Sequence, residues 1–248
     1  MSTVLKKTRT LIDTKMHYCP GCSHGIIHRL IGEVIDELDL REQSVGMAPV
    51  GCSVLLDAYL DIDVVQAAHG RAPAVATGVK RALPENLVFT YQGDGDLVSI
   101  GMSEMVHAAA RGERITIIFI NNTNYGMTGG QMAPTTLEKQ VTTTTPTGRD
   151  PQLAGYPIQV PELLYSLQGA RYLSRVSVHD PKNINKAKKS IQKAFQVQLD
   201  GLGFSLVEVL AICPTNWRMN PVQSLKWLEE NMIEAYPLGE LKTVEGVS

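Results

Sequence analysis

Two groups of residues in the sequence have side chains that could bind phosphate or metal ions. The first group directly follows two apolar runs: Gly93-Asp94-Gly95-Asp96 comes after residues 87–92, and Asn121-Asn122 comes after residues 115–120. Glycines let backbone N–H groups approach a phosphate closely, and the start of a following helix adds partial positive charge. Carboxylate and amide oxygens suit magnesium, which usually binds few protein groups together with phosphate oxygens. Either segment alone would be read as a polar turn, but the pair, one helix apart, predicts a magnesium and phosphate site.

The second group is the four cysteines of the chain, Cys19, Cys22, Cys52 and Cys213. Cys19 and Cys22 are separated by two residues, so both sulfurs can reach one metal centre from a single turn. The spacing fits three kinds of site equally well. These are a dithiol made by Cys19 and Cys22 alone, a structural zinc site, and a four-cysteine iron–sulfur cluster, which tolerates scattered ligands.

A sheet with helices on both faces is expected to position these residues. Helical patterns alternate with short apolar runs, which is typical of a doubly wound, mostly parallel α/β fold. We expect strands at residues 45–48, 64–67, 87–92, 115–120, 173–178 and 205–209, and helices at residues 26–38, 72–83, 103–111, 184–199 and 221–232. Because neighbouring parallel strands end at the same edge, where ligands of such folds bind, Asp94 and Asn122 are expected to lie close together.

Length and composition restrict the class of protein. The 248 residues are 44% hydrophobic, so we expect one domain over residues 1–248, with an N-terminal arm, a long loop at 121–156 and a C-terminal tail. The formal net charge of -2 comes from interspersed acidic and basic residues, which argues against nucleic acid as a partner. Apolar runs stay shorter than the roughly 20 residues of a membrane span, and residues 1–15 lack a secretory signal, so we expect a cytoplasmic protein without membrane contact. A reducing cytosol also favours free cysteines over disulfides.

The segment at 121–156 is rich in Thr, Gly and Pro and has no clear period. A loop of this length inside a domain is usually functional or disordered, and one interpretation is that it orders only when a partner docks. The lysines of the helix at 184–199 are interpreted as a solvated helix face.

The Gly-Asp-Gly and Asn-Asn segments together resemble the diphosphate motif of thiamine-diphosphate enzymes. The resemblance implies that the magnesium ion bridging the diphosphate is held by Asp94, by Asn122 and by the main-chain carbonyl of Asn124.

The whole chain resembles one family in particular, the β subunits of the 2-oxoacid:ferredoxin oxidoreductases. The resemblance covers nearly the full length and rests on His17-Tyr18-Cys19-Pro20-Gly21-Cys22, Gly51-Cys52-Ser53, His69-Gly70-Arg71, Gly93-Asp94-Gly95-Asp96, Tyr125-Gly126-Met127-Thr128-Gly129-Gly130-Gln131 and Cys213-Pro214-Thr215-Asn216-Trp217. It implies a [4Fe-4S] cluster on the four cysteines. It also implies a coenzyme site lined by Val50, Gly51, Cys52, Ser53, His69, Gly95, Asp96, Gly126 and Met127. The other histidines, His17, His24, His28, His107 and His179, are interpreted as structural or surface residues.

The reaction that the resemblance implies is the oxidative decarboxylation of a 2-oxoacid. Coenzyme A would accept the acyl group, and electrons would pass through the cluster to ferredoxin. The implied partners are an α subunit of the same enzyme and further small ferredoxin-like subunits. The carboxylate that activates the coenzyme is expected from the α subunit, so no catalytic residue is assigned in this chain.

The side chain of the 2-oxoacid is expected to be apolar. In this family, members that act on 2-oxoglutarate carry two lysines that pair with its distal carboxylate, and Leu55 and Gly129 stand at those positions here. An uncompensated carboxylate in an apolar pocket is costly, so we expect a branched-chain 2-oxoacid such as 2-oxoisovalerate. The alternatives are a 2-oxoglutarate-specific β subunit, a cluster-free thiamine-dependent decarboxylase, and a zinc-stapled subunit without activity.

Overall fold

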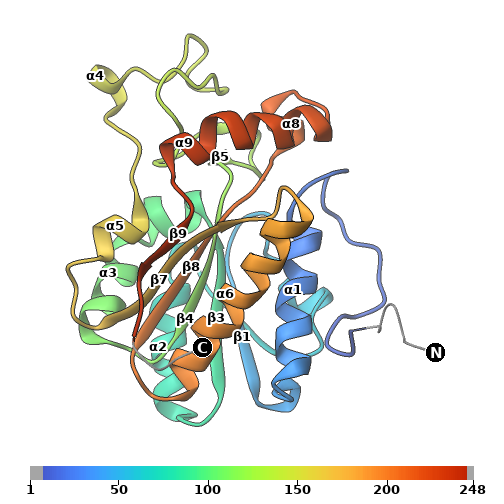
Figure 1. The fold of residues 1–248 in the computed structure, drawn as a ribbon, viewed down its shortest axis with the longest axis vertical. Coiled ribbons are helices and arrows are strands. Elements are labelled where there is room, and N and C mark those ends of the chain that lie inside the picture. Colours follow the sequence, from blue (N-terminus) through green and yellow to red (C-terminus); the bar gives the residue numbers. More distant parts are fainter. Residues whose placement is uncertain (1–7, 245–248) are drawn as a thin grey trace.

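A seven-stranded sheet runs through the part of the chain that the computed structural model describes, residues 8–244 (Figure 1). The strand order is β2-β1-β3-β4-β8-β7-β9. The strands are β1 (Ser44–Ala48), β2 (Asp63–Gln66), β3 (Leu87–Gly93), β4 (Thr116–Asn121), β7 (Ala170–Ser177), β8 (Phe204–Leu210) and β9 (Gly239–Lys242). Neighbouring strands of this sheet pair in parallel except β9, which is antiparallel to β7. The predicted mostly parallel α/β fold is therefore confirmed.

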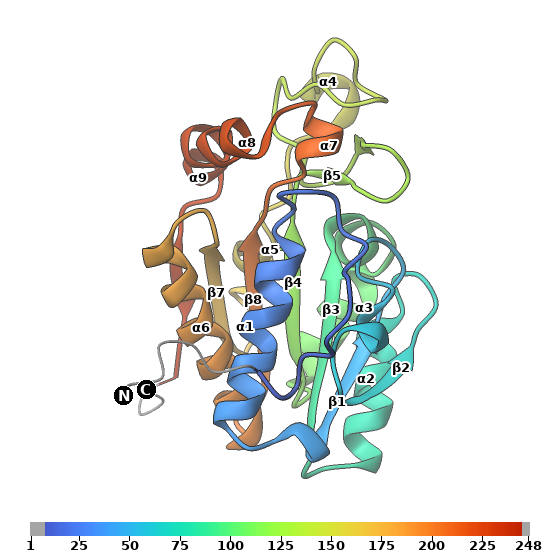
Figure 2. The same cartoon turned by 90° about the vertical axis from the view of Figure 1, so that its right-hand side faces the viewer.

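Helices cover both faces of the sheet (Figure 2). One face carries α1 (His24–Glu37) and α6 (Pro181–Leu199), whose apolar side chains share one buried cluster. The other face carries α2 (Ala72–Ala82), α3 (Met102–Arg111) and α5 (Val160–Leu164), which contribute to a second cluster. The central strands β3, β4 and β8 read as nearly continuous apolar runs because both of their faces are buried.

The ends of several helices follow from single residues. The side chain of Asp180 begins α6 by accepting a hydrogen bond from the backbone N–H of Asn183 at 2.7 Å. Gly112 ends α3 with a φ of 65°, which glycine adopts without steric cost. Pro84 lies just beyond α2 and cannot continue a helix.

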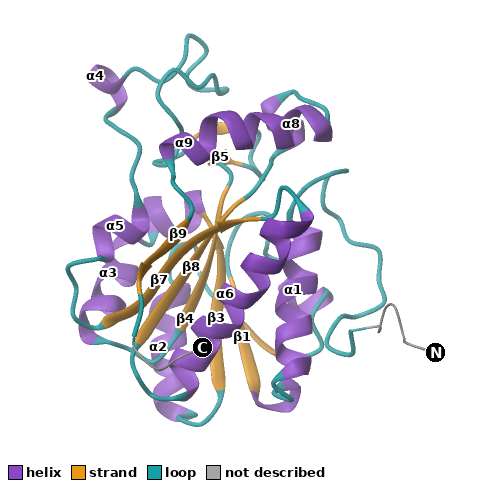
Figure 3. Cartoon of the chain, viewed as in Figure 1, coloured by secondary structure: helices purple, strands orange, loops and turns teal. Residues whose placement is uncertain are grey.

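A layer of loops and short elements lies above the carboxyl ends of the strands (Figure 3). It contains β5 (Asn124–Tyr125), β6 (Gln131–Met132), α4 (Pro151–Ala154), α7 (Pro214–Trp217), α8 (Pro221–Trp227), a π-helical turn η4 (Leu228–Met232) and α9 (Ile233–Ala235). Two short 3-10 turns, η1 (Arg41–Gln43) and η2 (Leu56–Ala58), and a π-helical turn, η3 (Gly95–Ile100), complete the elements.

Several features differ from the sequence prediction. Residues 239–242, in the expected C-terminal tail, form β9, and α5 lies where no element was expected. The last predicted helix, residues 221–232, continues through η4 into α9. One domain over residues 1–248 stays a prediction, with residues 8–244 built around one main sheet. Within residues 8–244, none of the helices is both long and apolar enough to cross a bilayer.

The long loop at 121–156 is organised around the buried side chain of Arg149. The guanidinium donates hydrogen bonds to the backbone carbonyls of Ala133, Pro134, Thr136, Ala154, Gly155 and Tyr156, at distances between 2.6 and 3.4 Å. These carbonyls lie at residues 133–136, in the middle of the segment, and at residues 154–156, at its end. One side chain therefore links two parts of a loop that has little regular structure of its own.

Replacing Arg149 with lysine should loosen this loop and leave the sheet intact. Lysine has three donors on one atom and cannot reach carbonyls on several sides, so buried acceptors lose their partners at a cost of about 3 kcal/mol. Hydrogen exchange should show lower protection in residues 133–156 and unchanged protection in β3 and β4. The exposed Arg171 gives the control: Arg171→Lys should leave the loop's exchange unaltered, and equal loosening in both variants would contradict this role.

Candidate functional site

Asp94 lies where β3 ends, and its carboxylate is buried. It accepts a hydrogen bond from the hydroxyl of Thr135 at 2.7 Å and another from the backbone N–H of Gly95 at 2.9 Å. Burial raises the pKa of Asp94 to about 7, because the charged form loses its hydration. A nearby cation would compensate this cost and favour the ionised form.

The asparagines after β4 surround the same point. The amide nitrogen of Asn124 donates to the backbone carbonyl of Asn122 at 3.0 Å, which leaves the side-chain oxygen of Asn124 buried without a partner in the described structure. Thr123, between them, adopts a φ of 59°, and its N–H donates to the side chain of Asn121 at 3.1 Å. The turn is thus held by its own hydrogen bonds, and the side-chain oxygen of Asn124 remains available as an acceptor.

These residues fit a magnesium ion. Asp94 supplies a carboxylate, Asn122 an amide oxygen and Asn124 a main-chain carbonyl, and the buried side-chain oxygen of Asn124 is a further acceptor without a partner in the described structure. Such hard oxygen ligands, few in number, are what magnesium takes when phosphates complete its coordination.

A cavity of about 140 Å³ opens beside these oxygens. Its lining residues are His24, Val50, Gly51, Cys52, Ser53, His69, Gly93, Asp94, Gly95, Asp96, Asn122, Asn124, Tyr125, Gly126, Met127 and Thr128. Every residue predicted to line the coenzyme or to hold magnesium is among them. The structure therefore brings these predicted residues together at one edge of the sheet.

Asp96 uses its carboxylate to hold the cavity walls. It accepts hydrogen bonds from His69 Nδ1 at 2.5 Å, from the N–H of Gly70 at 2.9 Å, from the N–H of Val50 at 3.3 Å and from the Gln92 amide at 2.5 Å. These donors come from two separate loops and one strand. His69 and Val50 are consequently fixed in relation to each other through one carboxylate.

The glycines of the site are required for close approach. A β-carbon at Gly95 would overlap the ring of Tyr125. A β-carbon at Gly126 would lie 3.1 Å from Cys52 Sγ and 3.8 Å from Cys213 Sγ. At Gly126 the loop of residues 125–131, called the coenzyme loop below, therefore meets two of the cysteines.

The four cysteines converge on the same end of the sheet. All four are free thiols, Cys19 exposed and the others half-buried. Burial raises the pKa of Cys22 to about 12, and electrostatic interactions with Cys213, Cys52 and Cys19 add to the rise, so the other three thiols lie within electrostatic range. Among residues 8–244, no three His, Cys, Asp or Glu side chains are arranged to hold a single metal ion.

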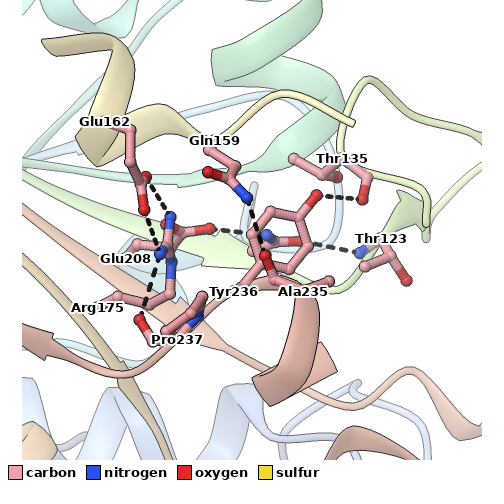
Figure 4. A network of polar contacts seen from close by, with 10 residues as sticks. Thr123, Thr135, Gln159, Glu162, Arg175, Glu208, Ala235, Tyr236 and Pro237 are labelled. Carbon is pink, nitrogen blue, oxygen red and sulfur yellow. Dashed lines mark hydrogen bonds and ion pairs between the residues drawn. The ribbon is translucent and has the colours of Figure 1, made fainter. Parts of the chain in front are cut away.

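A buried ion network lies below the site (Figure 4). Arg175 donates to Glu208 at 2.7 Å and to both oxygens of Glu162 at 2.6 and 2.8 Å, and Glu208 accepts from the amide of Asn121 at 2.7 Å. The ring of Tyr236 lies against Arg175, 5.3 Å from centroid to guanidinium carbon, and its hydroxyl donates to the carbonyl of Thr135. This network (Glu162, Arg175 and Glu208) therefore supports the asparagine turn directly and the Thr135 contact with Asp94 indirectly.

The comparisons with known proteins agree with this geometry. A family model described as the C-terminal TPP binding domain of thiamine pyrophosphate enzymes matches residues 49–209. The 2-oxoglutarate synthase subunit KorB of Archaeoglobus fulgidus is 40% identical over 214 residues, which are 86% of this chain and 76% of that protein. The chain belongs to the 2-oxoacid:ferredoxin oxidoreductase β-subunit family. The matched region is accordingly a thiamine diphosphate-binding domain.

Other members of the family show both the fold and a difference in length. The ketoisovalerate oxidoreductase subunit VorA of Methanothermobacter thermautotrophicus is 53% identical over 225 residues, 91% of this chain but 47% of that protein. The chain thus spans about half the length of this relative. A solved 2-oxoglutarate:ferredoxin oxidoreductase from Magnetococcus marinus, with 2-oxoglutarate, coenzyme A and succinyl-CoA bound, superposes with a TM-score of 0.82 at 25% identity, covering 98% of this chain and 86% of that one.

The sequence analysis did not place His24 in the cavity, although the structure does. It lines the cavity, its Nδ1 is 2.6 Å from the Tyr91 hydroxyl, and its ring stacks on Tyr18 with centroids 4.6 Å apart. Burial lowers the pKa of His24 to about 3, so the imidazole is neutral. Its position two residues after Cys22, at the start of a helix, was the available signal. Of the remaining histidines, His17 and His28 join this aromatic group, while His107 is exposed and His179 contacts Ser177.

The two residues used to predict the substrate lie outside the cavity lining. Leu55 is 39% exposed, and Gly129 has a φ of 112° with open space around its α-carbon. Neither residue would therefore touch a substrate bound inside this cavity.

Proposed function

We propose that this chain is the coenzyme-binding and cluster-binding part of a 2-oxoacid:ferredoxin oxidoreductase that converts a branched-chain 2-oxoacid, coenzyme A and oxidised ferredoxin to acyl-coenzyme A, carbon dioxide and reduced ferredoxin. The observation that carries the proposal is that two free cysteines, Cys52 and Cys213, meet the cavity at Gly126, while Cys19 and Cys22 lie within electrostatic range of them. Cys19, Cys22, Cys52 and Cys213 would hold a [4Fe-4S] cluster, and Asp94, Asn122 and Asn124 a magnesium ion.

The residues of the chain have separate tasks in this reaction. When bound, thiamine diphosphate supplies the electron sink that cleavage of a 2-oxoacid requires. Asp94, Asn122 and Asn124 would hold the magnesium ion that the diphosphate requires, and Asp96 holds the loops of Val50 and His69 that form the walls. The half-buried cysteines place a one-electron acceptor beside the coenzyme. The reduced state of these thiols suits a cytoplasmic location.

The test is anaerobic purification of the chain followed by iron, sulfide, magnesium and thiamine analysis. We expect a brown protein with four irons and four sulfides, whose visible absorbance bleaches on reduction. Colourless protein that contains zinc would support the zinc-stapled alternative, and colourless protein that binds thiamine would support a decarboxylase without a cluster.

A partner subunit should be needed for turnover. Within the described residues, the carboxylates of the cavity, Asp94 and Asp96, are occupied by protein donors and by the proposed metal, so neither is free to activate the coenzyme. We expect the chain alone to bind thiamine diphosphate but to turn over at less than about 1% of the rate of the complex, since loss of one acid–base group costs 10²–10⁴-fold. Brisk activity of the isolated chain would contradict the need for an α subunit.

The branched-chain preference is supported by the relative named ketoisovalerate oxidoreductase, which is 53% identical over 225 residues. The 2-oxoglutarate alternative is supported by the relatives named 2-oxoglutarate synthase. On the reconstituted complex, kcat/KM for 2-oxoisovalerate should exceed that for 2-oxoglutarate by at least about 10-fold, because an unpaired carboxylate in the pocket costs binding energy in the transition state. The opposite order would assign the chain to 2-oxoglutarate.

A further inference from the structure

One helical turn, α7, connects the coenzyme side of the site to the cysteine side. It begins directly after Cys213 and is followed by Arg218, which has a φ of 55°. Two neighbouring side chains of this turn, Asn216 and Trp217, are directed to different parts of the site.

The amide of Asn216 uses its nitrogen for two contacts. It donates to the backbone carbonyl of Gly126 at 2.7 Å and to Cys213 Sγ at 3.4 Å. A side-chain amide carries two N–H donors, so both hydrogen bonds can form at once. Gly130, with a φ of 81°, packs over this side chain, because a β-carbon there would lie 2.9 Å from Asn216 Cβ. The amide is therefore held in one orientation by the coenzyme loop.

Trp217 makes the complementary contact. Its indole Nε1 donates to the backbone carbonyl of Asn122 at 3.1 Å, and its ring packs against Trp227 with centroids 4.6 Å apart. Trp217 thus reaches the proposed magnesium turn, while Asn216 reaches a sulfur and the loop next to it.

We propose that Asn216 is a positioning residue that raises the reduction potential of the cluster by donating an N–H to Cys213 Sγ, while the same amide fixes the coenzyme loop through Gly126. The proposal rests on the proposed function, since it needs a cluster on the four cysteines. Reduction adds negative charge to the cluster sulfurs, and an N–H donor stabilises the more negative state. The potential of the cluster and the position of the loop beside it are then set by one side chain.

The test compares three variants of the full chain, purified anaerobically. Asn216→Leu removes the donor at similar size, and Asn216→Asp keeps the shape but replaces the N–H donors with oxygen. In a redox titration followed by electron paramagnetic resonance, both should have a more negative midpoint potential than the wild type. Trp217→Phe is the matched control: it should leave the potential unchanged and weaken thiamine diphosphate binding about 5-fold, the expected effect of one lost hydrogen bond.

The outcomes separate this proposal from the proposed function. A wild-type chain without iron or sulfide would remove the cluster and with it the proposed function. A cluster-containing wild type whose potential is matched by either Asn216 variant would overturn only the role of Asn216. So would a shift in Trp217→Phe as large as that in Asn216→Leu. If Asn216→Leu loses the cluster on purification, the potential of Asn216→Asp decides.

Discussion

Replacing Arg175 with methionine should lower the free energy of unfolding by about 3–5 kcal/mol. Arg175 and Glu208 are both fully buried, and the guanidinium also holds both oxygens of Glu162. Without the guanidinium, Glu208 stays in the core with only the Asn121 amide as partner. Burial already raises the pKa of Glu208 despite Arg175, so the isolated carboxylate would be strongly disfavoured. Chemical denaturation of the chain measures the loss.

Two further variants show whether the loss comes from an unpaired charge. Adding Glu208→Gln to Arg175→Met should recover a large part of the stability, since a neutral amide can still accept from Asn121 and leaves no buried charge. Breaking the exposed pair of Arg29 and Glu33 with Arg29→Met should cost less than about 1 kcal/mol. If the double variant were as unstable as Arg175→Met, the loss would come from packing around the arginine.

Replacing Asp94 with asparagine should weaken binding of thiamine diphosphate in the presence of magnesium by at least about 100-fold. Removing even a partner of a metal ligand costs about 10–100-fold, and Asp94 is the charged ligand itself. The free energy of unfolding should not fall, because the buried carboxylate is already disfavoured and its pKa is raised to about 7. Isothermal titration calorimetry on the metal-loaded chain measures the affinity.

A graded series makes the Asp94 prediction specific. Thr135→Val removes the hydroxyl that donates to Asp94 at 2.7 Å and should weaken binding about 10-fold. Asp57→Asn, at an exposed aspartate, should change nothing. Equal binding by wild type and Asp94→Asn would place magnesium elsewhere.

The sequence was informative wherever local pattern and tertiary environment agree. Strands such as β3 and β4 are apolar on both faces and end in Gly-Asp-Gly and Asn-Asn, so both their position and the meeting of Asp94 with Asn122 could be predicted. Strand β9 could not, because Gly239–Lys242 has no apolar alternation and is a strand only through its pairing with β7.

The motifs predicted which residues line the cavity, but they did not predict the hydrogen bonds that organise it. Asp96 belongs to a recognisable motif, but its four hydrogen-bond donors are brought together only by the fold. Arg175, Glu208 and Arg149 carry no sequence signal, since a buried charge is identified by its partners, which lie far away in the chain. His24 belongs to no motif that indicates a role, and its position in the cavity wall depends on how α1 packs.

The antiparallel β9 makes the two borders of the sheet unequal. At one border the last strand is β9, which pairs with β7. At the other border the last strand is β2, which is short and mostly solvent-exposed. Open backbone amides and carbonyls at a sheet border can recruit a further chain. A further chain that extends this sheet next to a parallel strand would therefore have to pair with β2. That strand lies at the opposite border of the sheet from β9 and the preceding Tyr236.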